Sequence, residues 1–326
     1  MAEVGIKIVT YNHEKVICKC IDSFLAQKTS FDFDITIYDD CSTDHTIEVL
    51  REKYGDSIKY HINKRNMGIG RNMYDALSQG NHRYRVLFAG DDWILENDSL
   101  QEMYDYLEGH KEASAVGVWS KVFDKDEKLI GEISPKCESY SMRLFLCGEQ
   151  VSADPTMFRD IYDGKKDKWF YEINSESNEP QMLFAIFLKG ELGVLHKYVR
   201  AYRFIKNDNA DNYNSTHTAM DTFVLFRRVL REIENRLNMS GLFTYKIIPL
   251  TSNVIKMSFV RMIKKHNMSD MRTLFKTISL SELVKGFMYI PILSIGKGSY
   301  PKIVFKSIVK KHKKKFDIRM IGEILC

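Results

Sequence analysis

The chain has 326 residues, of which 44% are hydrophobic and 12% aromatic, so it can bury a substantial core and is not a disordered protein. Lys and Arg number 48 against 43 Asp and Glu, which gives a formal net charge of +5. The balance is uneven, because the residues from Met257 to the end carry 15 basic and 4 acidic side chains. An acidic body followed by a basic region predicts two separate roles.

The first hundred residues alternate between short β-branched or aromatic runs and longer stretches with helical periodicity. The runs predict strands at 6–10, 35–38 and 85–88. The stretches between them repeat apolar residues at helical spacing: Val16, Cys20, Phe24 and Leu25, then Ile47, Leu50 and Tyr54, then Met73 and Leu77. This alternation predicts a Rossmann-like α/β fold in which a mostly parallel sheet is flanked by helices.

Beyond Asp92 the alternation is looser. The patterns predict helices at 99–107 and 181–189 and again from about Thr218. They predict extended segments at 115–119, 128–133, 192–196 and 199–204. We therefore expect a first domain at 1–217, with halves 1–110 and 111–217, and a helical, basic C-terminal region at 218–326.

Cysteine usage and apolar runs bear on the cellular compartment. The six cysteines show neither the spacing of a zinc site nor a dense disulfide framework, which is typical of reduced thiols in the cytoplasm. The N-terminus lacks a signal-peptide pattern. The apolar run at 286–295 is about half as long as a membrane-spanning helix and contains Pro291. We expect a cytoplasmic chain that does not cross a membrane.

Polar clusters follow the predicted strands, at the edge where open parallel sheets bind ligands. They are TYNHE at 10–14, DDCSTD at 39–44, NMGIGRN at 66–72 and GDDW at 90–93. Taken singly, the clusters have simpler explanations: a helix cap, loop glycines and a solvated acidic turn. Together they bring paired carboxylates to one edge, which is unfavourable without a cation or hydrogen-bond donors. With Arg71 near a helix start, this favours a nucleoside diphosphate and a divalent cation, Mn²⁺ or Mg²⁺.

The run from Ile6 to Trp93 resembles the nucleotide-binding half of the family 2 glycosyltransferases, which have the GT-A fold. The four clusters occur in the family's order and with nearly its spacing. The resemblance is strong over roughly 5–110, weaker to about 205, and absent past about 220. It implies an inverting glycosyltransferase that uses a nucleotide-sugar donor.

The resemblance also implies which residues hold the nucleoside. Thr10, Tyr11 and Glu14 match the positions that hold the uracil ring and the ribose. Asp40 or Asp39 matches the carboxylate that accepts a hydrogen bond from the pyrimidine N3–H. Uridine is favoured over guanosine and thymidine through the resemblance alone.

Further matches surround the diphosphate. Arg71 matches a basic position next to the nucleotide, Asp91 is placed near the ribose, and Asp92 matches the aspartate that ligates the metal. Many relatives have Asp-Ser-Asp-Asp where this chain has Ala-Gly-Asp-Asp at 89–92, so the metal would rest mainly on Asp92, water and the diphosphate. Trp93 is a candidate for stacking on a sugar face. Trp169 is a weaker one, because packing explains it as well.

The acceptor side of the resemblance lies in the second half of the chain. Glu179 falls where the family places its catalytic base, and a positioned carboxylate can take the proton of an attacking hydroxyl. This chain has Glu where the family usually has Asp, and Asn178 stands where the family has a neighbouring acidic residue. Glu176 is a rival candidate for the base. The simpler explanation for Glu179 is an acid stabilised at a helix N-terminus, followed by Pro180 in the first turn.

We expect a metal-dependent transfer from a UDP-sugar to a glycan or lipid-linked acceptor, in bacterial-type surface polysaccharide synthesis. The alternative is a non-catalytic relative that binds a nucleotide-sugar or a glycan. In the basic C-terminal region, lysines interleaved with apolar residues favour binding to the anionic inner face of the cell membrane. A solvated basic helix is the simpler explanation, and nucleic-acid binding is disfavoured because no recognition fold accompanies the charge.

Overall fold

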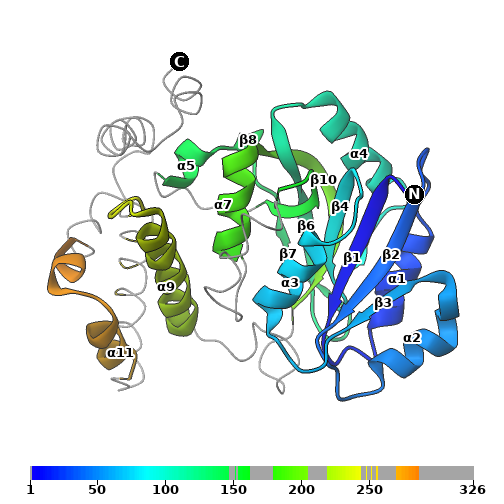
Figure 1. Cartoon of the computed structure of the whole chain (residues 1–326), viewed down its shortest axis with the longest axis horizontal. Coiled ribbons are helices and arrows are strands. Elements are labelled where there is room, and N and C mark those ends of the chain that lie inside the picture. Colours follow the sequence, from blue (N-terminus) through cyan, green and yellow to red (C-terminus); the bar gives the residue numbers. More distant parts are fainter. Residues whose placement is uncertain are drawn as a thin grey trace. The chain divides into compact units, whose positions relative to one another are not determined.

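The computed structural model describes residues 2–146, 151, 153–161, 179–204, 219–243, 247, 251, 255 and 269–285. The chain divides into two compact units. The first combines Met1–Ser141 with Ser152–Thr216, and the second combines Met142–Val151 with His217–Cys326. The sheet and all the predicted nucleotide-binding residues belong to the first unit (Figure 1).

The first unit is built on one mixed sheet, whose described strands are β1 (Val4–Thr10), β2 (Phe33–Asp39), β3 (Lys59–Ile62), β4 (Tyr84–Ala89), β5 (Trp93–Ile94), β6 (Ala113–Phe123), β7 (Leu129–Ile133), β8 (Ser139–Tyr140), β9 (Asp154–Phe158) and β10 (Glu191–Arg203). Their order is β3-β2-β1-β4-β9-β6-β10-β5, with β7 beside β6 and β8 beside β10. Neighbours from β3 to β4 pair in parallel, as do β6 and β10. Because β9 is antiparallel to both β4 and β6, these two also run the same way. The predicted α/β class and mostly parallel sheet are confirmed.

Helices α1 (Ile17–Leu25), α2 (Thr46–Tyr54), α3 (Ile69–Ser78), α4 (Ser99–Gly109) and α7 (Glu179–Lys189) belong to the first unit, with the short 3₁₀ turn η1 (Gly55–Ser57). One face of the sheet packs against α1 and α4, where Ile6, Ile17 and Phe24 are fully buried. Phe24 meets Phe88 of β4 edge to face, with ring centroids 5.1 Å apart. The prediction that Leu25 lines the buried face of α1 is wrong, because this side chain is 48% exposed.

The second unit is helical where it is described. Its helices are α5 (Met142–Leu146), α9 (Ala219–Leu237) and α11 (Ser269–Thr277). Glu282 accepts from Arg227 of α9 at 2.7 Å and from Arg231 at 2.6 Å, so an ion-pair network holds this unit together. The lysine-rich run at 310–315 lies outside the described residues. No helix in the described part of the chain is long and apolar enough to cross a membrane.

Candidate active site

The predicted clusters meet because the strands that precede them end side by side. In the pairing of β1 with β2, Thr10 lies opposite Asp39, and in the pairing of β1 with β4, Val9 lies opposite Ala89. The loops that follow these strands therefore start from one edge of the sheet. This is the edge at which open α/β sheets bind ligands.

Hydrogen bonds join the loops after β1 and β2. The Asn12 backbone N–H donates to the Ser42 hydroxyl at 2.9 Å, and the Asn12 side-chain oxygen accepts from the Thr43 N–H at 2.8 Å. Glu14 accepts from the His45 N–H at 3.0 Å. The segment from Ser42 onward thus does more than cap a helix. It fixes the position of the loop that contains the predicted nucleoside contacts.

The predicted nucleoside contacts in this loop differ in burial. Thr10 is buried, with its hydroxyl 3.1 Å from His13 Nδ1. Tyr11 and Glu14 are partly exposed. Of the three residues, Tyr11 and Glu14 are therefore the ones that solvent reaches.

Asp39 and Asp40 are both buried and use their carboxylates to organise turns. Asp39 accepts from the Ser42 N–H at 2.9 Å and from the Ser42 hydroxyl. One oxygen of Asp40 accepts from Asn63 and from the Met67 N–H, and the other accepts from the Gly68 N–H, each at 2.8 Å. Since a carboxylate offers about four lone-pair sites, Asp40 can still accept one more hydrogen bond.

The predicted basic residue stands at the start of α3. Arg71 has a side chain 35% exposed, and its Nε donates to both oxygens of Asp75, one turn along the helix, at 3.0 and 2.9 Å. Next to it, buried Asn72 donates to the Tyr38 carbonyl at 2.8 Å and accepts from Asn63. Asn72 thereby ties the start of α3 to the end of β2.

Asp92, the predicted metal ligand, is deeply buried. Its side chain is 0% exposed. One oxygen accepts from Nε and Nη2 of Arg200, and the other accepts from the Arg203 backbone N–H at 2.8 Å. Burial raises the pKa of Asp92, whereas the guanidinium and the N–H favour its ionised form. The Asp92 carboxylate thus accepts three hydrogen bonds within the protein and is sealed from solvent, whereas Asp91 beside it is partly exposed.

Trp93, the predicted candidate for stacking on a sugar, is also buried. Its side chain is 8% exposed, and the Lys19 ammonium lies 3.6 Å from its ring centroid. The Arg203 guanidinium lies 5.1 Å from the same ring, and the Phe123 ring packs at 5.0 Å. The Trp93 ring is thus in contact with two cations and another aromatic side chain, and its stacking on a sugar stays a prediction.

The acceptor side is described in part. Glu179 is the first residue of α7, which fits the predicted position at a helix start, but its side chain lies outside the described residues. The rival Glu176 and the tryptophan at 169 lie outside them as well. In the described part of the chain, no group of three or more His, Cys, Asp or Glu side chains is arranged to hold a metal ion.

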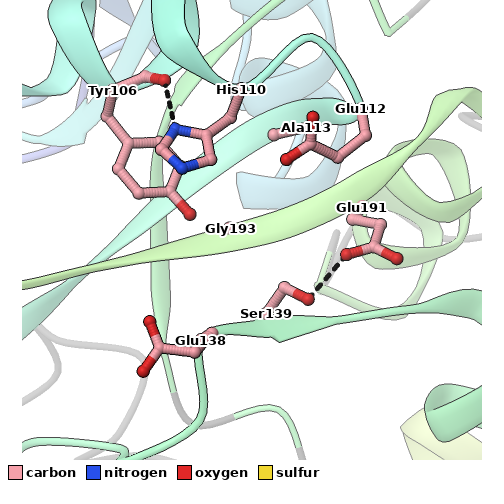
Figure 2. A pocket seen from close by; sticks show the side chains of 8 residues that line it. All are labelled: Tyr106, His110, Glu112, Ala113, Glu138, Ser139, Glu191 and Gly193. Atoms are coloured by element: carbon pink, nitrogen blue, oxygen red, sulfur yellow. Dashed lines mark hydrogen bonds between the residues drawn. The ribbon is translucent and has the colours of Figure 1, made fainter.

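Figure 2 shows a separate cavity at the opposite ends of β6 and β10. The rings of Tyr106 and His110 stack there with centroids 4.0 Å apart, and the Ser139 hydroxyl donates to Glu191 at 2.6 Å. Glu112 and Glu138 also line it. An acidic cavity does not suit the phosphates of a nucleotide, so the candidate site is the one at the ends of β1, β2 and β4.

Residues 6–157 match the family model "Glycosyl transferase family 2". Nearly half of the chain is therefore similar to the family 2 glycosyltransferases. The matched segment holds all four polar clusters, so the resemblance seen in the sequence is confirmed. The match to the family model ends before α7.

Curated relatives match over about a third of the chain. An abequosyltransferase of Salmonella typhimurium is 36% identical over 105 residues, which are 31% of each protein. An uncharacterized protein of Mycobacterium tuberculosis is 32% identical over 114 residues, 34% of this chain and 33% of that protein. The matched stretches therefore span about a third of these relatives' own length.

Solved structures match over most of the chain. The Staphylococcus aureus TarS fragment 1–349, crystallised with UDP-GlcNAc, has a TM-score of 0.61 and 16% sequence identity. The match covers 96% of this chain and 92% of that fragment. At this identity the similarity shows a shared fold, so the expected GT-A architecture is confirmed.

Proposed function

We propose that this chain is an inverting glycosyltransferase that moves a sugar from a UDP-sugar to a glycan or lipid-linked acceptor in surface polysaccharide synthesis. The observation that carries the proposal is the meeting of the four clusters at one sheet edge, within the segment that matches family 2. The UDP-GlcNAc in the TarS complex supports a UDP-linked donor. The name abequosyltransferase supports sugar transfer by a relative.

In this proposal the uridine lies against the joined loops after β1 and β2. Tyr11 and Glu14 are partly exposed there and contact the base and the ribose, while Thr10 is buried. The remaining acceptor site of Asp40 takes the hydrogen bond from the pyrimidine N3–H, while Asp39 holds the adjacent turn. Because these loops are already hydrogen-bonded to one another, binding loses little conformational entropy.

The diphosphate lies toward α3 and the turn after β4. Arg71, partly exposed, balances its charge. A bound Mn²⁺ or Mg²⁺ would stabilise the negative charge of the departing nucleoside diphosphate. Asp91 is the residue of the acidic turn that would hold this ion, together with phosphate oxygens and water, because Asp92 is already engaged by Arg200 and Arg203.

Glu179 is the proposed base that takes the proton of the acceptor hydroxyl as this attacks the sugar. A Glu179→Gln variant tests this assignment. Loss of transfer with unchanged donor binding supports Glu179 as the base, whereas transfer equal to that of the wild type points to Glu176 or, where neither protein transfers a sugar, to the non-catalytic alternative.

A nucleotide-release assay tests the proposal. The full-length chain is given UDP-, GDP- and dTDP-sugars with and without Mn²⁺, beside Asp91→Asn and the control Asp105→Asn, an exposed carboxylate on α4. We expect the wild type to release UDP from one UDP-sugar, and only when Mn²⁺ is present. The Asp91→Asn variant should lose this activity, and the Asp105→Asn variant should keep it. If calorimetry also detects no binding of any of these donors, the proposal is wrong.

The basic C-terminal region is proposed to hold the enzyme on the anionic inner face of the membrane, close to a lipid-linked acceptor. Fifteen basic against four acidic residues from Met257 onward support this. Co-sedimentation with anionic vesicles at low salt is the test. A chain that stays in the supernatant with anionic vesicles, as it does with neutral ones, would refute it.

A further inference from the structure

A partly buried ion-pair network, with Asp92 fully buried, crosses the sheet beside the candidate site. Arg200 of β10 donates through Nε and Nη2 to Asp92, in the turn after β4, and through Nη1 to Asp154 at the start of β9. Since β4, β9, β6 and β10 are consecutive in the sheet, one guanidinium links three separate strands or their ends. The three residues are far apart in sequence but form a single charged group.

The network fixes the acidic turn at several points. The Asp92 backbone N–H donates to the Ala89 carbonyl at 3.2 Å, and its carboxylate is held by Arg200 and by the Arg203 N–H. The carbonyl of Asp91 accepts from Arg203 Nε at 3.1 Å. The Asp91 carbonyl and the Asp92 carboxylate are therefore both tied to β10.

The burial of these charges needs an explanation beyond stability. A buried ion pair is often no more stabilising than apolar residues of the same volume, because both charges lose their hydration. What such a pair supplies is geometry, since each donor and acceptor has a fixed direction. Here the fixed element is the turn that carries Asp91. The guanidinium is itself immobilised, with Phe88 and Tyr202 ring centroids at 5.3 and 5.4 Å.

We propose that Arg200 is a positioning residue of the donor site: anchored by Asp154, it holds Asp92 and so sets the orientation of Asp91 toward the diphosphate. The inference rests on the proposed function. It assigns Asp92 to the support of the turn, and Asp91 to contact with the ligand. Lysine cannot replace Arg200 in this role, because a single ammonium cannot bridge both aspartates with the same geometry.

The test compares Arg200→Lys with Arg85→Lys in the full-length chain. Arg85 serves as the control because it is an arginine with little exposed surface, lies on β4, and pairs with Asp160 through Nη1 at 3.1 Å, but it precedes the acidic turn by several residues. UDP affinity is measured by calorimetry, and kcat and KM are measured with the donor that the wild type hydrolyses. Hydrogen exchange of the 89–94 peptide and the melting temperature are recorded for each protein.

We expect Arg200→Lys to melt close to the control, to exchange faster in the 89–94 peptide, and to lose about 10- to 100-fold in kcat/KM for the donor. Arg85→Lys keeps wild-type donor kinetics. If Arg200→Lys is folded and its donor kinetics equal those of Arg85→Lys, the positioning role is refuted, even where exchange increases. A wild type that binds neither UDP nor any nucleotide-sugar refutes the proposed function itself.

A second variant covers the case in which Arg200→Lys does not fold. Asp154→Asn keeps the contact between Arg200 and Asp92 but removes the charge that anchors the guanidinium. A positioning role predicts a smaller loss of donor kcat/KM in this variant, in the same direction, with faster exchange at 89–94. Wild-type donor kinetics in folded Asp154→Asn would overturn the proposal in that case.

Discussion

The backbone N–H of Gly68 donates a 2.8 Å hydrogen bond to the carboxylate of Asp40, which joins the loop before α3 to the end of β2. Asp40 also accepts from the Met67 N–H, so this loop depends on a carboxylate buried beneath it. Gly68 has a φ of 85°, in the region that favours glycine. The same carboxylate is the proposed acceptor for the uracil ring, so loop structure and nucleoside binding are coupled.

This coupling predicts that Asp40→Asn weakens both stability and UDP binding. An amide offers one acceptor oxygen, so at least one of the donors now paired to Asp40 loses its partner, which costs about 1–3 kcal/mol. Urea unfolding and UDP calorimetry measure the two effects, with Asp105→Asn as the control for a lost surface carboxylate. Unchanged UDP affinity in a destabilised Asp40→Asn would contradict the proposed contact with the base.

The close approach of β10 to α4 predicts a large effect of Gly193→Ala. A Cβ at Gly193 would collide with the ring of Tyr106, and the strand backbone cannot move away without breaking its pairing with β6. We expect a loss of about 1–3 kcal/mol in the free energy of unfolding. In Gly131→Ala, the matched change on β7, the nearest atom is 3.8 Å away, so this variant keeps its stability. Equal stabilities in urea would show that α4 packs less closely there.

Buried Lys7 predicts a pH-dependent difference between the wild type and Lys7→Met. Lys7 is 2% exposed and its ammonium lies 3.4 Å from the Thr36 hydroxyl, and burial lowers its pKa to about 8. In the unfolded chain the pKa of Lys7 is about 10.4. Between pH 8 and pH 10.4 the unfolded state therefore binds more protons than the folded state, and the stability of the wild type rises with pH. Below pH 8 the buried charge is destabilising.

Lys7→Met removes this charge while keeping the length of the side chain. We expect the variant to be more stable than the wild type at pH 7, by about 2–3 kcal/mol, with the difference shrinking as the pH approaches 10.4. Urea unfolding at several pH values measures it, and Lys111→Met, on an exposed lysine, serves as the control. A difference that does not change between pH 7 and 10 would mean that Lys7 is not charged and buried as described.

Much of the fold could be predicted because local patterns determine it. The run at 6–10 is β-branched and lies in β1, and the helical spacing of Cys20 and Phe24 matches their full burial in α1. β3 was missed because KYHI, at the sheet edge, has no buried side chain. The two extended segments predicted at 192–204 are one strand, β10, with irregular register between Leu195 and Tyr198.

The site was predictable where its residues follow strands, and not where they depend on distant partners. The acids after β2 and β4 are visible in the sequence as charges that end apolar runs. The role of Asp92 depends on Arg200, 108 residues away, and the burial of Trp93 depends on Lys19 and Arg203. In the sequence, the signal for this contact is Arg200 itself, a charged residue between two buried residues, Val199 and Ala201.

The central claim is that the edge formed by β1, β2 and β4 binds a UDP-sugar and that Asp91 contacts the diphosphate side of it. Calorimetric titration of the wild type and Asp91→Asn with UDP, with and without Mn²⁺, tests this most directly. We predict that the wild type binds UDP more tightly with Mn²⁺, and that Asp91→Asn loses this gain while keeping metal-free binding. A wild type that does not bind UDP, or an Asp91→Asn variant with the full gain from Mn²⁺, would contradict the account.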